Sequence, residues 1–226
     1  MTTSGTAAFN MDLTEIVEEA FERAGSEMRS GYDLRTARRS LNLLFADWAN
    51  RGVNMWTFEQ GSIPMVQGTA TYDLPVDTVD LLEQVIRTTT SGTQSDLTMS
   101  RISVSTYSSI PTKTSQGRPV QVLVNRTATP SVTVWPVPNE SDTYTLIYWR
   151  LRRIQDAGGG VNTMDVPFRF IPCMVAGLAY YIALKVPGGV ERLPILKQQY
   201  DEAWDLASTE DREKASVRFV PRGMRI

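Results

Sequence analysis

The sequence predicts an α+β protein. Helical hairpins from the two chain ends are predicted to form a four-helix bundle, and an antiparallel β-sandwich or barrel-like module is inserted in the sequence between them. Apolar residues recur at helical spacing near both ends, whereas the middle of the chain is rich in threonine, serine and proline in short alternating runs. We predict helical hairpins over 10–53 and 165–210, a β-rich module over 54–157 and an extended C-terminal arm over 211–226.

The first hairpin is predicted from helix start and stop signals. Asp12 with Glu15 forms a capping box, and Gly25 ends the apolar pattern that follows it. Asp33 is predicted to cap a second helix that ends at Gly52. The polar faces of these two helices carry opposite charges, which makes them candidate subunit interfaces: Glu18, Glu19 and Glu22 on the first, and Arg35, Arg38 and Arg39 on the second.

The β-rich module is predicted from alternating runs that end at turn residues. No helical pattern alternates with these runs, which favours antiparallel pairing over a parallel sheet. The predicted strands are Thr57–Ile63, Ala70–Leu74, Leu82–Thr89, Leu97–Ile102, Val120–Asn125, Ser131–Trp135 and Thr143–Arg150.

After the β-rich module, Gly158-Gly159-Gly160 is predicted to be a flexible joint. Two helices follow, with Pro172 and Pro194 expected in their first turns, where proline is tolerated. Beyond Ser208 the amphipathic pattern fades.

The C-terminal arm alternates basic and apolar residues. A disordered terminus is one interpretation, but disordered tails are depleted in apolar residues, so we favour a docking arm. The candidate docking residues are Arg212, Lys214, Val217, Arg218, Phe219, Val220, Arg222, Met224, Arg225 and Ile226.

Composition excludes several classes of chemistry. The 226-residue chain has a formal net charge of -2, no histidine and one cysteine, Cys173. Without histidine, the Ser-His and Cys-His nucleophile pairs and the commonest metal ligand are absent. There is no phosphate-binding glycine loop, so we expect no cofactor and no catalytic residue. The apolar stretch between Arg169 and Lys185 is too short for a membrane span, and no membrane partner is expected.

Three clusters leave alternatives open. Asp73, Asp77 and Asp80 are the only candidates for a carboxylate-dependent hydrolase, although a solvated turn is the favoured interpretation. The five tryptophans and eight tyrosines could stack on sugars or single-stranded nucleic acid, but core or interface packing is favoured. The basic run at Arg150, Arg152 and Arg153 fits either salt bridges to an acidic helix or contact with a phosphate backbone.

A series of segments resembles a known family when taken in order. These include Leu41–Ala49 in the first hairpin, the Ala70–Pro75 strand exit, and Gly117-Arg118-Pro119. Val132–Pro138, Tyr144–Trp149 and Asp165–Pro172, which leads into Leu178–Tyr181, complete the series. Together they resemble the head-to-tail adaptor proteins of short-tailed bacteriophages, also called connector, tail-accessory or tail tubular proteins.

The resemblance implies a structural virion protein and not an enzyme. It implies a homo-oligomeric ring of twelve copies at the head-tail junction, assembled in the host cytoplasm, which binds the portal protein and gives the tail or nozzle protein its platform. Genomic double-stranded DNA would pass through the lumen without sequence-specific binding, and the C-terminal arm would dock on the portal. The alternatives are a virion-associated carboxylate-dependent peptidoglycan hydrolase and a carbohydrate- or nucleic-acid-binding β module.

Overall fold

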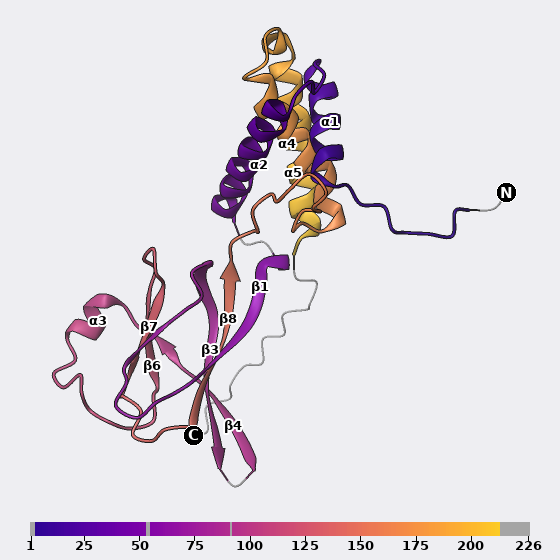
Figure 1. Cartoon of the computed structure of the whole chain (residues 1–226). Helices are drawn as coiled ribbons and strands as arrows, with labels where there is room; N and C mark the ends of the chain where they lie inside the picture. Colours follow the sequence, from indigo (N-terminus) through magenta and orange to yellow (C-terminus); the bar gives the residue numbers. More distant parts are fainter. Residues whose placement is uncertain (1–2, 53–54, 91, 213–226) are drawn as a thin grey trace, which may run out of the picture. The chain divides into compact units, whose positions relative to one another are not determined.

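A computed structural model describes residues 3–52, 55–90 and 92–212 and has a mixed α and β fold (Figure 1). This confirms the α+β class. The chain divides into two compact units, each treated separately below. A helical unit takes the chain up to Arg51 and from Gln155 onward, and a β unit takes Gly52–Ile154.

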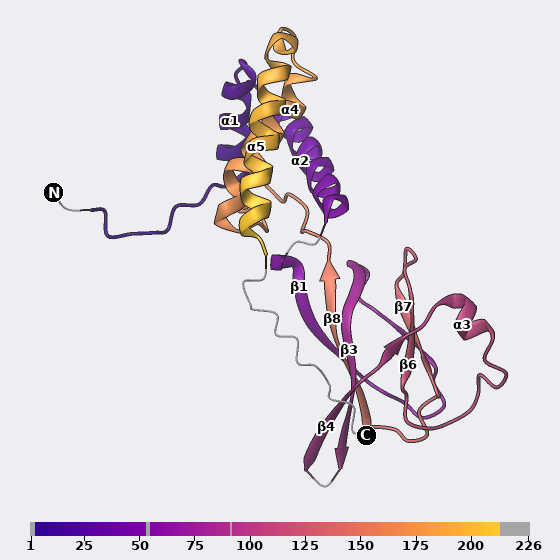
Figure 2. The ribbon, with the colours of Figure 1, turned by 180° about the vertical axis from the view of Figure 1, so that it is seen from behind.

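The helical unit is built around α4 (Ile171–Ala183), which is buried along most of its length. Helices α1 (Leu13–Ala24), α2 (Gly31–Arg51) and α5 (Leu193–Glu210) each pack against α4 (Figures 1 and 2). Short 3-10 turns precede α4 (η2, Phe168–Phe170) and α5 (η3, Gly189–Arg192). Each of the three outer helices therefore buries one face and leaves the opposite face to solvent.

The helix ends follow local sequence signals, with one correction. The capping box of Asp12 and Glu15 on α1 is confirmed, and so are the first-turn prolines of α4 and α5. Asp33, however, does not cap α2 from outside, because the helix already begins at Gly31. Its carboxylate accepts the Ser30 backbone N–H at 3.1 Å, while Ser30 Oγ accepts the Asp33 N–H at 3.4 Å. Ser30 therefore takes the capping position and Asp33 the third position of the box.

Aromatic side chains fill the core between α2, α5 and η2. Trp48 is fully buried, and its ring centroid lies 5.5 Å from that of Phe170 and 5.4 Å from that of Trp204. The indole N–H of Trp48 donates to Tyr200 Oη at 2.9 Å. Burial raises the pKa of the Tyr200 hydroxyl, which keeps it neutral and able to accept this bond.

The three-glycine segment is held in place, which corrects the prediction of a flexible joint. The carbonyl of Gly160 accepts the Thr14 N–H at 3.1 Å, and the carbonyl of Gly158 accepts Arg38 Nη1 at 3.4 Å. The preceding Ala157 N–H donates to Asn42 Oδ1 at 2.8 Å. Hydrogen bonds to α1 and α2 thus fix the backbone here, and a run of glycines is no proof of mobility.

The β unit contains two four-stranded sheets, ordered β1-β8-β3-β4 and β2-β7-β6-β5. One apolar cluster takes buried residues from both sheets, among them Leu81, Leu146, Val122 and Val134. The strands are β1 (Phe58–Pro64), β2 (Thr71–Asp73), β3 (Thr78–Thr90), β4 (Thr93–Thr98), β5 (Ser100–Arg101), β6 (Gln121–Asn125), β7 (Ser131–Trp135) and β8 (Tyr144–Arg152).

The predicted single strand over Leu97–Ile102 is wrong. The chain leaves the first sheet after β4, buries Met99, and enters the second sheet as β5. Met99 N–H donates to Gln84 O in the first sheet, and Ser100 N–H donates to Val120 O next to the second. Because β5 pairs with β6 in parallel, pairing is not antiparallel throughout as predicted. The short helix α3 (Val104–Ser108) was also not predicted.

The Trp48–Tyr200 hydrogen bond gives a first prediction. We expect Tyr200→Phe to lower the free energy of unfolding by about 1–3 kcal/mol, because the buried indole N–H would lose its acceptor. Urea unfolding at constant pH measures this. The matched control is Tyr32→Phe, since Tyr32 is 66% exposed and its hydroxyl can bond to water. Equal stability of the two variants would contradict the assignment.

Candidate functional site

The acidic candidates on α1 divide into two groups. Glu18 and Glu22 are exposed and lie with Glu15 on one helix face, three and four residues apart. We call these three residues the acidic face of α1. Glu19 lies beside them, and its carboxylate accepts Arg23 Nε at 2.7 Å. Within the described residues Glu18 and Glu22 form no ion pair, so their charges face solvent.

The basic candidates on α2 are also not equivalent. Arg35 and Arg39 are exposed on the face opposite the buried stripe, and Arg38 is turned toward the Gly158 carbonyl. Lys185, at the end of α4, donates to Ser40 Oγ at 2.6 Å. Partial burial and the nearby charge of Arg39 lower the pKa of Lys185, which indicates that positive charges gather at this surface.

The predicted docking arm begins at a fixed point. Asp211, the last capping residue of α5, is buried and pairs with Arg169, whose guanidinium also lies 5.9 Å from the Phe170 ring centroid. Arg212 follows directly and is exposed. The other predicted arm residues lie outside the described part of the chain: Lys214, Val217, Arg218, Phe219, Val220, Arg222, Met224, Arg225 and Ile226.

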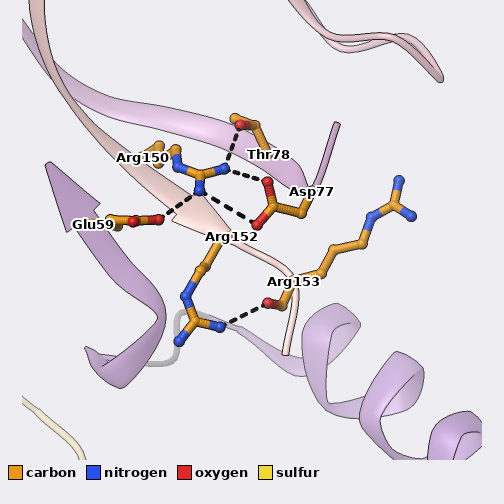
Figure 3. Close-up of polar contacts among 6 residues, drawn as sticks. All are labelled: Glu59, Asp77, Thr78, Arg150, Arg152 and Arg153. Carbon is orange, nitrogen blue, oxygen red and sulfur yellow. Dashed lines mark hydrogen bonds and ion pairs between the residues drawn. The ribbon is translucent and has the colours of Figure 1, made fainter. Parts of the chain in front are cut away.

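The basic run at the end of β8 contains an ion-pair cluster around the buried side chain of Arg150 (Figure 3). The Arg150 side chain is only 8% exposed. It donates to Asp77 Oδ1 at 2.5 Å, to Glu59 Oε2 at 2.5 Å and to Thr78 Oγ1 at 2.9 Å. Glu59 lies on β1, Asp77 lies in the turn before β3, and Thr78 is the first residue of β3. A single guanidinium therefore ties three neighbouring strands together.

For Arg150, this geometry favours the salt-bridge interpretation, although not with the acidic helix that was predicted as the partner. The acids that meet Arg150 come from β1 and from the turn before β3, and not from a helix. Because its donors are engaged by carboxylates, Arg150 is not presented to a phosphate backbone. Burial alone would lower the pKa of Arg150, but the carboxylates outweigh it and raise that pKa. Arg152 donates to the Arg153 carbonyl at 3.0 Å, and the exposed Arg153 side chain points away from the cluster (Figure 3).

The three candidate catalytic acids serve different roles. Asp77 is held by Arg150, and the hydrogen bond from that arginine lowers the pKa of Asp77, opposite to the shift that a general acid needs. Asp80 pairs with Arg101 at 2.8 Å and with Arg126 at 3.5 Å. Asp73 is exposed at the end of β2. Asp77, in the turn before β3, and Asp80, on β3, are therefore engaged in ion pairs, which the solvated-turn interpretation did not include.

Among the described residues, no three histidine, cysteine or acidic side chains are placed to hold a metal ion. The free thiol of Cys173 is buried, and burial raises its pKa to about 12, so the thiolate needed for nucleophilic chemistry is suppressed. No helix in the described ranges is both long and apolar enough to span a bilayer.

The tryptophans lie in different environments. Trp48 and Trp204 belong to the helical core. Trp135 donates its indole N–H to the Thr112 carbonyl at 3.1 Å and lines an open hollow of about 420 Å³. Trp149 is 45% exposed on β8 and lines a second hollow of about 290 Å³. Trp135 and Trp149 belong to different sheets, so they do not form one continuous stacking platform.

Sequence reasoning missed several residues of these surfaces. Glu59 was not connected with Arg150, because no local pattern links residues on two strands that are 91 positions apart. Tyr32 and Leu43 are exposed beside Arg35 and Arg39. Their spacing on the polar side of α2 was a signal that could have found them.

Taken together, the described surfaces of the helical unit include charged helix faces on α1, α2 and α5. Comparison with family models identifies the group: the SU10 adaptor protein model matches residues 11–222, and the chain belongs to this family. Membership confirms the resemblance and is consistent with a bacteriophage head-to-tail adaptor, a structural component of the virion. A search of curated proteins gives no match.

The Asp77–Arg150 pair gives a prediction about pH. The pKa of Asp77 is lowered in the folded protein, so the unfolded state binds a proton more readily. The stabilisation is therefore complete above the unfolded pKa of about 3.9, and it is lost as the pH falls through the lower, folded pKa. We expect Asp77→Asn to reduce stability at pH 7 and to flatten its decline below about pH 4.

Acid unfolding followed by tryptophan fluorescence measures this effect. Asp73→Asn is the matched control, because Asp73 lies four residues before Asp77, at the end of β2, and forms no ion pair within the described residues. If Asp73→Asn and Asp77→Asn shift the acid transition equally, the pairing with Arg150 does not govern it.

Proposed function

We propose that this protein is a head-to-tail adaptor that assembles as a ring of twelve copies beneath the portal vertex. In this role the ring continues the DNA channel and gives the tail or nozzle protein its attachment platform. The observation that carries the proposal is the family match, which runs from Met11 to Arg222 and so includes both compact units and most of the arm. Before it enters the virion, the protein would be found in the host cytoplasm.

The parts of the fold take separate roles in this proposal. The helical unit acts as a four-helix bundle that contacts neighbouring copies and the portal, and the two sheets act as a sandwich that faces the tail. The exposed charges of Glu18, Glu22, Arg35 and Arg39 support assembly contacts, because a ring needs two different complementary patches on each subunit. Glu19 and Arg38 lie next to those patches and would be at the edge of the contacts, although each already has a partner within the chain.

Weak electrostatics suit a channel through which DNA must slide. The chain has a formal net charge of -2, and the buried Arg150 is engaged by carboxylates. A protein whose net charge is close to zero has no strong overall attraction to the duplex. The DNA would therefore pass through the proposed ring without being bound tightly.

The proposal predicts assembly on the portal. Light scattering of the protein mixed with purified portal rings should show a complex larger than either component, and electron micrographs should show an added ring on the portal. A protein that stays monomeric and never joins the portal would refute the proposal. Clearing of cell-wall suspensions that is abolished by Asp73→Asn would favour the hydrolase alternative instead.

The proposal also predicts a role for the C-terminal arm. Truncation after Arg212 should leave the helical circular dichroism signal intact and weaken portal attachment by on the order of tenfold or more, because basic and apolar docking groups are lost. Co-sedimentation with portal rings measures attachment. Removal of residues 3–8, which are exposed at the other end of the chain, is the matched control. Equal attachment of the truncated and full-length proteins would show that the arm is not needed.

A further inference from the structure

The outer face of α2 combines positive charge with exposed apolar groups. Tyr32, Arg35, Arg39 and Leu43 follow one another at intervals of three, four and four residues, so they share one helix face. Tyr32 is 66% exposed and Leu43 is 54% exposed. Neither arginine forms an ion pair within the described residues. We call these four residues the basic face of α2.

The outer face of α5 has the same construction with the opposite charge. Ile195, Glu202 and Leu206 are separated by seven and four residues, and Asp205 is exposed beside them. Ile195 is 57% exposed and Leu206 is 76% exposed. Neither Glu202 nor Asp205 forms an ion pair within the described part of the chain, and Glu202 only accepts a hydrogen bond from Gln198 Nε2 at 2.8 Å. We call these four residues the acidic face of α5.

The acidic face of α1 is a poorer partner for the basic face of α2. Its members are Glu15, Glu18 and Glu22, and it carries no exposed large apolar side chain. Stable protein contacts bury apolar groups in addition to pairing complementary charges. On the helical unit, the acidic face of α5 supplies both, because Ile195 and Leu206 flank its carboxylates.

We infer that the basic face of α2 docks on the acidic face of α5 of a second copy of this chain. The inference rests on the proposed ring and identifies one of its contacts. The two faces belong to different helices of one molecule, so the contact is heterologous: each copy uses its α2 on one neighbour and its α5 on the other. Repetition of such a contact extends the assembly until it closes.

The composition of the α2 face argues for protein and against DNA as its partner. A surface that binds DNA is dominated by contacts from basic and polar groups to phosphates. Here two large apolar groups, Tyr32 and Leu43, flank only two arginines. Burial of these apolar groups against Ile195 and Leu206 would stabilise a protein contact and contribute nothing to phosphate binding.

Reversal of charge tests the contact. Arg35→Glu with Arg39→Glu makes the α2 face acidic, and Glu202→Arg with Asp205→Arg makes the α5 face basic. For each double variant alone, the amount of protein assembled on portal rings should fall on the order of tenfold or more below that of the wild type. The reason is that like charges then meet. Mixed in equal amounts, the two variants should recover assembly, since each interface again joins opposite charges. Light scattering with portal rings measures all four samples.

A third variant keeps the choice of α5 falsifiable. Glu18→Arg with Glu22→Arg makes the same charge change on α1, and we expect that mixing it with the Arg35→Glu, Arg39→Glu variant does not recover assembly. If this variant fails to assemble while Glu202→Arg with Asp205→Arg succeeds, α1 is the partner and the inference is overturned. Normal assembly of the Arg35→Glu, Arg39→Glu variant, together with loss of salt-dependent binding to duplex DNA, would overturn it in favour of DNA.

The wild-type sample separates this inference from the proposed function. Failure of the wild type to join portal rings would refute the adaptor proposal itself. Normal assembly of every reversed variant alongside an assembling wild type would refute only the α2–α5 contact. Circular dichroism of each variant shows whether the helical unit is folded, and these exposed positions give no packing reason for it not to be.

Discussion

The burial of α4 is the constraint on which the helical unit depends. Because α4 is apolar along most of its length, α1, α2 and α5 must each turn one face toward it. Their opposite faces are then fixed in position, and they carry the charges and exposed apolar groups that an assembly protein presents. The same packing places Trp48, Phe170 and Trp204 in one aromatic core.

In the β unit, ion pairs stabilise the end of the first sheet at which the chain enters and leaves. Arg150 is buried at the end of β8, and the carboxylates of Glu59 and Asp77 compensate its charge from β1 and from the turn before β3. A buried guanidinium without such partners would be costly. The cluster therefore fixes these strands relative to one another at the end where the chain enters and leaves the unit.

Features set by local signals could be predicted from the sequence. The capping box at Asp12 and the strand Ser131–Trp135 were predicted correctly, because a few adjacent residues determine them. The partners of Arg150 could not be predicted, since they depend on strand order. The difference between Arg38 and its neighbours Arg35 and Arg39 arises only because the segment at Gly158 runs past one side of α2. The sheet change at Met99 depends in the same way on distant pairing.

The ion pair between the partly exposed Arg169 and the buried Asp211 has a mechanical consequence. Asp211 closes α5 and precedes the C-terminal segment, while Arg169 stands in η2 at the foot of α4. A pull on that segment therefore acts first on this ion pair, which connects the end of α5 to η2, the turn before α4. We therefore expect this contact to oppose fraying of the last turn of α5 by linking that turn to η2.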